Sequence, residues 1–337
     1  MGTRSADGTG FAAGSLIMMK QLMTLAGILA LQACAIGEEG SSADRAVAEN
    51  GVAPTTPLPN GQRVGFILAH GLAGSVDSYD PAIVTALAAD GFYVLRDAVP
   101  PVDSVATRAA SLATQVDAFI ATNKLDRVHI IAHSMGGLDS RYLISSLGYA
   151  SKIASLTTLE TPHRGSPLAD IALGITHSLT ASQEDALLAL TDVLGPDVNS
   201  AQVHRALVDL AEASAPAFNA ANPDRAGVTY YSYAGYSTLF GVSNWNADDL
   251  CSSTGVTTPS PASLPGELQL TGPIVGGFWL RPHDGVVPVD SAMWSGFLGC
   301  IPTDHLDMTR AGVKDAADLD LPLVPFYRQI AARVVGL

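Results

Sequence analysis

Basic residues and charge in general are scarce in this sequence. Lys and Arg together number 18 against 32 Asp and Glu, the formal net charge is -14, and charged residues make up only 15% of the 337 residues. No cluster of Lys and Arg occurs, which argues against a nucleic-acid-binding protein, because phosphate contacts need a basic face. Repeats of fixed period are also absent, which argues against a solenoid or a propeller.

What the chain has instead is apolar. Hydrophobic residues make up 47% of the sequence, although aromatic residues make up only 6%. A disordered chain would have fewer apolar and more charged residues, so the composition predicts a globular protein. The length fits one large α/β domain or two smaller ones.

The first apolar run predicts an export signal over residues 1–34. Lys20 precedes the run 22–31, and small residues follow around Ala33 and Ala35. The run is too short to span a bilayer as a stable helix. Residues 31–34 resemble the lipobox of bacterial lipoproteins, which predicts lipidation of Cys34 and a protein anchored to the outer membrane. Cleavage after Ala35 with secretion is the first alternative, and a buried N-terminal helix is the second.

Residues 35–60 are rich in Gly, Glu, Ser, Ala and Pro, with few large apolar side chains, and predict a flexible tether. The folded domain is then expected over residues 61–337. If Cys34 carries lipid, Cys251 and Cys300 remain as a pair, and an oxidising compartment favours a disulfide between them. Two buried thiols are the alternative.

From residue 63, short apolar runs alternate with helical patterns. This alternation predicts an α/β fold with a mostly parallel sheet covered by helices on both faces. An Ala/Leu-rich helical stretch over about 168–222 interrupts the pattern and is interpreted as an insertion above the sheet. The expected strands cover 64–69, 92–95, 128–132, 154–159, 228–233 and 277–280, and helices are expected after Pro81, over 104–122, from Met135 and over 322–335.

Ser134 lies in the sequence Ala-His-Ser-Met-Gly-Gly, directly after an expected buried strand and before an expected helix. A nucleophile elbow needs this context, a tight turn between small residues that lets a strained Ser point out of the sheet. Ala132 stands where the usual pattern has Gly, and Ala is the next smallest residue. A Ser in an ordinary turn is the alternative.

A Ser hydroxyl needs a base and an acid that orients the base. His305 lies late in the chain in a loop and fits the base, whereas Asp284 lies in a Gly-containing turn and fits the acid, which gives the order Ser, acid, His. The rival His residues are His283, adjacent to the acid, and His129, inside a strand, together with His163, His177 and His204 in or beside the insertion. The rival acids are Asp290 and Asp304.

An anionic intermediate needs preorganised N–H donors. The backbone N–H groups of Met135, directly after the Ser, and of Leu72, in the loop after the first strand of the domain, are placed for this purpose. His70 and Gly71 before Leu72 allow that loop to turn sharply. A simple turn is the alternative interpretation of this pair.

Together these motifs resemble secreted bacterial triacylglycerol lipases of the Pseudomonas and Burkholderia type, over about residues 60–337. The most specific element is the run Thr-Pro-His-Arg-Gly-Ser. The motifs that carry the resemblance are His70-Gly71-Leu72, Ala132 to Leu138, Ser140-Arg141-Tyr142, Thr161 to Ser166, Tyr230 to Gly235, His283-Asp284-Gly285 and His305-Leu306-Asp307.

The resemblance implies an α/β-hydrolase that cleaves long-chain acylglycerols at an oil-water interface, with a mobile apolar lid in the insertion. It implies no cofactor for the chemistry but a structural calcium ion near the catalytic His, for which Asp307 matches one ligand. Asp249 and Glu267 are candidates for an upstream ligand, and the family's downstream ligand falls near Ala311. Some members of the family need a membrane-bound foldase.

The sequence therefore predicts a carboxylic ester hydrolase with Ser134 as nucleophile, His305 as base and Asp284 as orienting acid. A short-chain carboxylesterase or an acyltransferase with the same triad is the first alternative. A non-catalytic surface lipoprotein that uses the fold as a binding module is the alternative of another class.

Overall fold

The computed structural model describes residues 42–59, 61–174, 200–238, 250–251, 262–264, 266–269, 271–277, 281–308 and 321–337. Several predictions lie outside these ranges: the export signal with Cys34, the strand residues 278–280, the middle of the insertion, and the calcium-ligand positions 249 and 311. By contact, Ala43–Leu337 form one compact unit. Within the described part of the chain, no helix has both the length and the apolar content that a membrane span requires.

A seven-stranded sheet forms the centre of this unit, and all of its pairs are parallel except the one at the β1 edge. Its strands are apolar because both faces of the sheet are covered by helices. Every residue of the strand over Gly65–Ala69, for example, is buried. In spatial order the strands are β1 (Gly51–Val52), β3 (Tyr93–Arg96), β2 (Gly65–Ala69), β4 (Val128–His133), β5 (Ile153–Leu159), β6 (Thr229–Gly235) and β9 (Phe297–Ile301).

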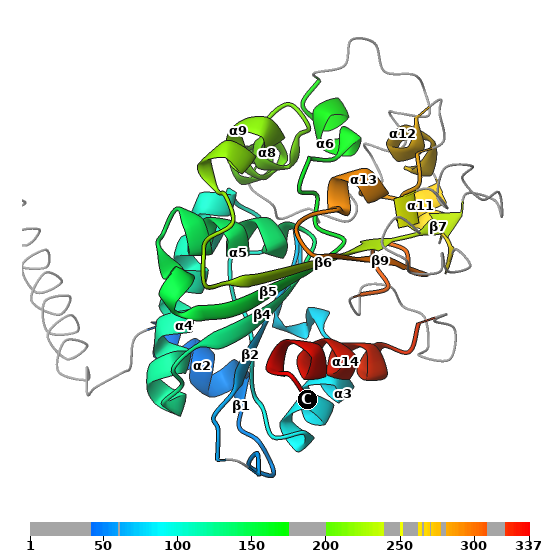
Figure 1. The fold of residues 1–337 in the computed structure, drawn as a ribbon. Helices are drawn as coiled ribbons and strands as arrows, with labels where there is room; N and C mark the ends of the chain where they lie inside the picture. The colour runs from blue at the N-terminus through cyan, green and yellow to red at the C-terminus, as the bar shows by residue number, and fades with distance from the viewer. Residues whose placement is uncertain are drawn as a thin grey trace, which may run out of the picture. The chain divides into compact units, whose positions relative to one another are not determined.

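Helices pack on both faces of the sheet (Figure 1). The core on one face contains residues of α2 (Ser42–Asn50), α4 (Val105–Asn123) and α5 (Met135–Ser145). The core on the other face contains residues of α3 (Pro81–Ala89) and α14 (Leu323–Val335). The predicted α/β class and sheet with two covered faces are thus confirmed.

The helix ends follow local chemistry. Ser104 caps α4 by accepting a hydrogen bond from the backbone N–H of Thr107 at 3.2 Å, and Lys124 ends the helix in a left-handed conformation. Asp80 caps α3 in the same way, with Pro81 at its first position. The predicted helix over 104–122 therefore differs from the observed helix by one residue at each end.

The structure differs from the predicted flexible tether over residues 42–52, which form a helix and a strand. Ala43 and Val47, one helical turn apart in α2, are buried at 8% and 4% exposure in the core. The next two residues form β1, which pairs antiparallel with β3. The polar composition of this segment concealed it, because only one face of a short surface helix needs to be apolar.

The described ends of the insertion are helical. They are α6 (Pro167–Ala172), α8 (Ser200–Leu210) and α9 (Ala215–Ala221). Ala206 and Leu207 of α8 pack in one cluster with Met135 and Leu138 of α5, so this helix covers the start of the helix that follows Ser134. The remaining short elements are η1 (Val76–Ser78), η2 (Tyr149–Ser151), β7 (Ser237–Thr238), β8 (Ala262–Ser263), α11 (Gly266–Gln269), α12 (Gly272–Gly276) and α13 (Val289–Ala292).

Cys251 and Cys300 form a disulfide, with their Cα atoms 5.3 Å apart. This is the predicted pair. Cys300 belongs to β9, and His305 lies in the turn that follows this strand. The disulfide therefore anchors the strand that leads to the predicted base.

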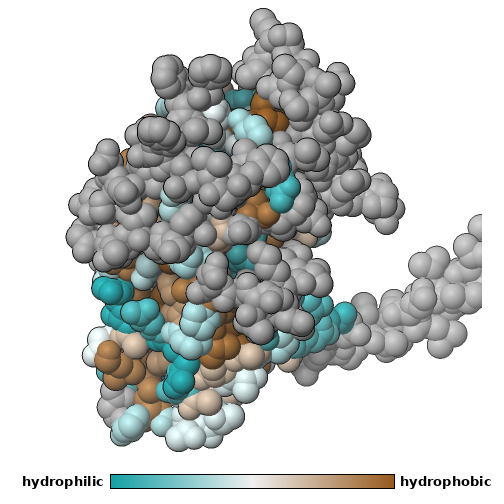
Figure 2. Space-filling view, turned by 90° about the vertical axis from the view of Figure 1, so that its right-hand side faces the viewer, coloured by the Kyte–Doolittle hydropathy of each residue, from teal (hydrophilic) through white to brown (hydrophobic). Residues whose placement is uncertain are grey.

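Large hydrophobic side chains are scattered over the described surface. Leu147, Val208 and Leu337 are exposed at 37%, 39% and 74%. On the face shown in Figure 2, hydrophobic and hydrophilic residues lie side by side over the part that is coloured. Single exposed apolar residues of this kind are common on protein surfaces and need no special explanation.

His129 predicts a pH-dependent stability that can be measured. Its ring stacks on Phe66 and is bonded to the Ser155 hydroxyl at 2.8 Å, and burial, aided by the charge of Arg127, lowers its pKa to about 4. Because the unfolded chain binds a proton more readily, this stabilisation is present above pH 6.5 and is lost as the pH falls toward 4. In urea unfolding, the free energy of unfolding of the wild type should fall between about pH 7.5 and about pH 5. We expect this fall to be smaller by about 1–2 kcal/mol in His129→Gln. An equal loss in both proteins would contradict this role.

Candidate active site

Ser134 occupies a strained turn between β4 and α5. Its backbone has φ +53° and ψ -129°, a conformation that costs a non-glycine residue about 1–3 kcal/mol. The end of β5 and the loop after it hold Ser134 there, because its N–H donates to the Leu159 carbonyl at 3.0 Å and its own carbonyl accepts from the Thr161 hydroxyl at 2.8 Å. The turn therefore presents the Ser side chain beyond the carboxyl end of β4.

Glycines make this turn sterically possible. A Cβ at position 136 would lie 2.6 Å from the Ala69 carbonyl oxygen, and one at position 137 would overlap the Thr161 side chain. A Cβ at Gly71 would lie 2.7 Å from that of Ser134. The Gly residues of both motifs thus allow the loop after β2 to lie against the Ser.

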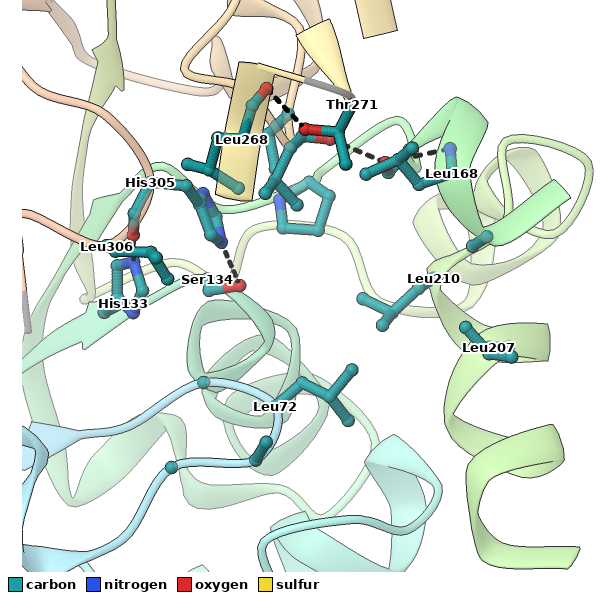
Figure 3. A pocket seen from close by; sticks show the side chains of 18 of the residues that line it. Leu72, His133, Ser134, Leu168, Leu207, Leu210, Leu268, Thr271, His305 and Leu306 are labelled. Carbon is teal, nitrogen blue, oxygen red and sulfur yellow. Dashed lines mark hydrogen bonds between the residues drawn. The ribbon is translucent and has the colours of Figure 1, made fainter. Parts of the chain in front are cut away.

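Ser134, His305 and Asp284 lie in one chain of hydrogen bonds. The Ser134 Oγ is 2.9 Å from His305 Nε2, and His305 Nδ1 is 2.8 Å from Asp284 Oδ2 (Figure 3 shows the first of these bonds). An ionised carboxylate can only accept, so Nδ1 carries the ring proton and Nε2 is the acceptor for the Ser hydroxyl. The structure thus brings the three predicted side chains together in an order that allows proton transfer.

The loops around Asp284 and His305 fix both side chains. Asp284 Oδ1 accepts from the backbone N–H groups of Val286 and Val287 at 2.8 and 2.7 Å. The backbone N–H of His305 donates to the Asp284 carbonyl at 2.9 Å. The carboxylate therefore stays aimed at the imidazole.

The rival residues have other partners. His283 accepts the Gly285 N–H at Nδ1, and burial lowers its pKa to about 4. Asp290 forms an ion pair with Arg281 at 2.8 Å. Asp304 accepts the Leu306 N–H at 2.8 Å within its own turn. Neither His283 nor Asp290 is bonded to the imidazole of His305 in the described structure.

The two predicted oxyanion donors flank the Ser. Leu72 lies in the loop after β2 and lines the same cleft as Ser134, and Met135 is the first residue of α5. Within the described residues, neither backbone N–H has a protein acceptor. Unpaired N–H groups beside a nucleophile can hold a developing oxyanion.

A buried arginine, which the sequence analysis did not single out, fixes the loop that carries Leu72. Arg108 of α4 is fully buried and donates at 2.8 Å to the His70 carbonyl and at 3.3 Å to the Gly71 carbonyl. Its Nε pairs with Asp139 of α5 at 2.8 Å. The Arg108 side chain thus joins the loop that carries Leu72 to the helix that begins after Ser134.

The run Thr161–Ser166 clamps the loop that carries Asp284. The Ser166 hydroxyl donates to the Val286 carbonyl at 2.6 Å, and the Ser291 hydroxyl donates to the Gly165 carbonyl at 2.6 Å. The Arg164 N–H donates to the Ser291 hydroxyl at 3.0 Å. The most specific motif of the sequence therefore supports the orientation of the acid.

Ser134 and His305 lie at one end of an apolar cleft. In Figure 3, Leu72, Leu207 and Leu210 lie on one side of the cleft and Leu268 on another. The described insertion helices α6 and α8 contribute Leu168, Ala169, Leu207 and Leu210 to the lining. The remaining lining residues are Gly71, Ala73, Gly74, Ser78, His133, Pro162, Ser166, Thr271, Val286, Val287 and Leu306.

Known proteins share this architecture. The model of the alpha/beta hydrolase fold family matches residues 66–184. The mature Bacillus licheniformis lipase BlEst2 superposes with a TM-score of 0.56 at 21% identity, covering 76% of this chain and 90% of that one. The chain has the α/β-hydrolase fold.

Two curated proteins that are similar in sequence are triacylglycerol lipases. Triacylglycerol lipase 2 of Saccharomyces cerevisiae is 28% identical over 228 residues, 66% of this chain and 59% of the yeast protein. The triacylglycerol lipase of Vibrio cholerae is 27% identical over 301 residues, 81% of this chain and 88% of the Vibrio protein. This α/β-hydrolase chain thus spans less than two thirds of the yeast relative.

The expected calcium site is not completed by the described residues. Calcium takes about six to eight oxygen ligands. Asp307 Oδ2 accepts the Asp304 N–H at 2.9 Å, and the side chain of Glu267 lies outside the described structure. In that part of the chain, the group with three ligand-type atoms within 4.8 Å is His133, Glu160 and His305, whose two imidazoles do not suit calcium.

Buried charged residues near the site escaped the sequence analysis. Arg108 and Asp139 are exposed at 0% and 1%, Asp97 at 1% and Glu160 at 0%. The sequence contains an indication that Arg108 is buried. It lies three residues after Val105 and four before Leu112, a spacing that places it on the apolar face of α4. A charge at a core position of an amphipathic helix indicates a buried partner.

Proposed function

We propose that the protein hydrolyses ester bonds of triacylglycerols and related long-chain esters, as a lipase of the Pseudomonas and Burkholderia type. The observation that carries the proposal is the 2.9 Å contact between Ser134 Oγ and His305 Nε2 at the end of an apolar cleft. The similarity to triacylglycerol lipases at 27–28% identity supports an ester hydrolase. The cleft lining supports an apolar acyl group as its ligand.

In the first half-reaction, Ser134 Oγ attacks the ester carbonyl carbon while its proton passes to His305 Nε2. The carbonyl oxygen becomes an oxyanion within reach of the Leu72 and Met135 N–H groups, and one such donor is worth about 3 kcal/mol in a transition state. His305 then donates this proton to the oxygen of the leaving alcohol, and the bond between the carbonyl carbon and that oxygen breaks. The product is an acyl-enzyme on Ser134.

In the second half-reaction, water repeats the sequence. His305 takes a proton from the water, whose oxygen attacks the acyl carbon, and then returns the proton to Ser134 Oγ as the fatty acid leaves. Asp284 keeps the Nδ1–H in place and stabilises the imidazolium in both halves without accepting its proton. The three roles are those predicted from the sequence.

Acyl chain length distinguishes this function from its alternatives. We expect the rate of hydrolysis of octanoyl and oleoyl triglycerides to increase once the substrate concentration exceeds its solubility limit. A long acyl chain makes more contacts with the apolar cleft, and the undissolved substrate presents that chain at an interface. Ser134→Ala is the control in a titration of released fatty acid. Hydrolysis confined to soluble butyryl esters would favour the carboxylesterase, and alcohol-dependent ester formation would favour the acyltransferase.

We further propose export through residues 1–34, with Cys34 as the lipidated first residue of the mature chain. Mass spectrometry of the mature N-terminus tests this, because a diacylated Cys34 and a free N-terminus after Ala35 differ in mass. A chelator arm in the hydrolysis assay tests the structural calcium ion that the resemblance to lipases implies. Refolding with and without a membrane-bound foldase tests the need for that partner.

A further inference from the structure

Glu160 is a buried carboxyl group that the mechanism above does not use. It directly follows β5, has no exposed surface, and has φ +56°. A left-handed conformation is unfavourable for a non-glycine residue, and burial of a carboxyl adds a further cost. Two unfavourable features at one residue indicate a role that offsets them.

The two oxygens of Glu160 have different surroundings. Oε1 accepts the hydroxyl of Thr303 at 2.5 Å. Oε2 has no hydrogen-bond partner, although it lies 3.4 Å from His133 Nε2 and 3.9 Å from His305 Nδ1. The imidazole nitrogen that bonds to Asp284 at 2.8 Å therefore has a second carboxyl oxygen about 1 Å further away.

A glycine leaves room for both carboxyl side chains. A Cβ at Gly235 would lie 2.5 Å from Glu160 Oε1 and 2.7 Å from Asp284 Cβ. Gly235 is the last residue of β6, the strand adjacent to β5. The end of the sheet is thus shaped to hold two acids beside one imidazole.

Asp284 and Glu160 differ in the hydrogen bonds that their carboxyl groups accept. Asp284 accepts from two backbone N–H groups and from His305, whereas Glu160 accepts only from Thr303 among the bonds observed. Burial, with the charges of Asp284, Asp304 and Asp307, raises the pKa of Glu160 well above its usual range. The raised pKa and the single hydrogen bond both favour a neutral Glu160 carboxyl in the resting site.

We propose that Glu160 is a second acid for His305, a positioning residue that takes over the bond to Nδ1 when Asp284 cannot accept it. The inference rests on the proposed function. Removal of the Asp284 charge removes the largest repulsion on a Glu160 carboxylate, and a side-chain rotation closes the gap of 3.9 Å. His133, which donates to the His305 carbonyl at 3.0 Å, keeps the imidazole within reach.

The test compares kcat and KM of the full-length enzyme on a soluble ester for Asp284→Asn, Glu160→Gln and both changes together. A triad without its acid loses about 10⁴-fold in kcat. We expect about 10²-fold for Asp284→Asn, less than about 5-fold for Glu160→Gln and about 10⁴-fold for the double variant, with KM unchanged. This non-additive pattern in kcat alone is not expected from a structural role.

Two further double variants serve as a second test and as a matched control. Glu160→Gly removes the carboxyl and fits the positive φ, so Asp284→Asn/Glu160→Gly tests the same point in a relaxed backbone. Asp290→Asn removes a carboxyl of the acid loop that pairs with Arg281 instead, so Asp284→Asn/Asp290→Asn should match Asp284→Asn. Thermal unfolding shows that each variant is folded.

The inference is overturned if Asp284→Asn is already as inactive as its double variants with Glu160→Gln and Glu160→Gly, or if the two losses simply multiply. It is also overturned if the double variant with Asp290→Asn is the one that loses the residual activity. A wild-type protein without Ser134-dependent ester hydrolysis overturns the proposed function and this inference with it.

Discussion

Replacement of Ser134 or His305 by Ala lowers kcat by about 10⁶-fold, because the nucleophile and its base act as one unit. The loss falls on kcat because the apolar cleft that binds the acyl chain remains. Ser134→Ala removes one oxygen atom from a backbone that its neighbours hold in place, so the thermal midpoint stays near that of the wild type. Hydrolysis of a soluble ester measures the effect.

The double variant Ser134→Ala/His305→Ala is the control for this prediction. Because the two residues act together, it should be no less active than either single variant. Losses that multiply in the double variant would contradict a shared catalytic step. So would a Ser134→Ala protein that retains more than about 1% of wild-type kcat.

Replacement of Arg108 by Met destabilises the fold by about 3–5 kcal/mol, because it leaves Asp139 buried without its ion-pair partner. The His70 carbonyl loses the Arg108 hydrogen bond in the same variant, whereas the Gly71 carbonyl keeps the Gly74 N–H as a donor. The pKa of Asp139 is already raised to about 7, chiefly by burial, and the guanidinium of Arg108 opposes that shift. Urea unfolding measures the stability, and ester hydrolysis measures the activity.

The double variant Arg108→Met/Asp139→Leu separates stability from activity. It removes the unpaired charge and should recover most of the lost stability. It should not recover kcat, because the loop that carries the Leu72 N–H still lacks its anchor. Full activity in a stable double variant would show that the Arg108 contact to this loop is dispensable.

The sequence predicted the parts of the fold in which local pattern and burial agree. The strand before Ser134 is a continuous apolar run, and the small residues around it leave few other conformations, so β4, the turn and α5 were all expected. The chain order of nucleophile, acid and base placed Asp284 and His305 correctly at one end of the sheet. Their hydrogen bonds to each other and to Ser134 agree with this prediction.

Other features depended on contacts that the sequence does not display. The segment from Ala43 to Val52 was expected to be a tether, since its apolar face has only two buried residues. Glu160 follows a buried strand, but nothing in its neighbours indicates that it faces His305. Its position becomes meaningful only when β5 and β6 bring it beside Asp284.

Covalent labelling with a fluorophosphonate tests the central claim most directly, because this reagent reacts with an activated Ser and requires no knowledge of the substrate. We expect one phosphonyl group per chain, on the peptide that contains Ser134, and no labelling of Ser134→Ala. His305→Ala should label much more slowly, since its Ser lacks the base. Labelling at a different residue, or none on a folded wild-type protein, would contradict the account.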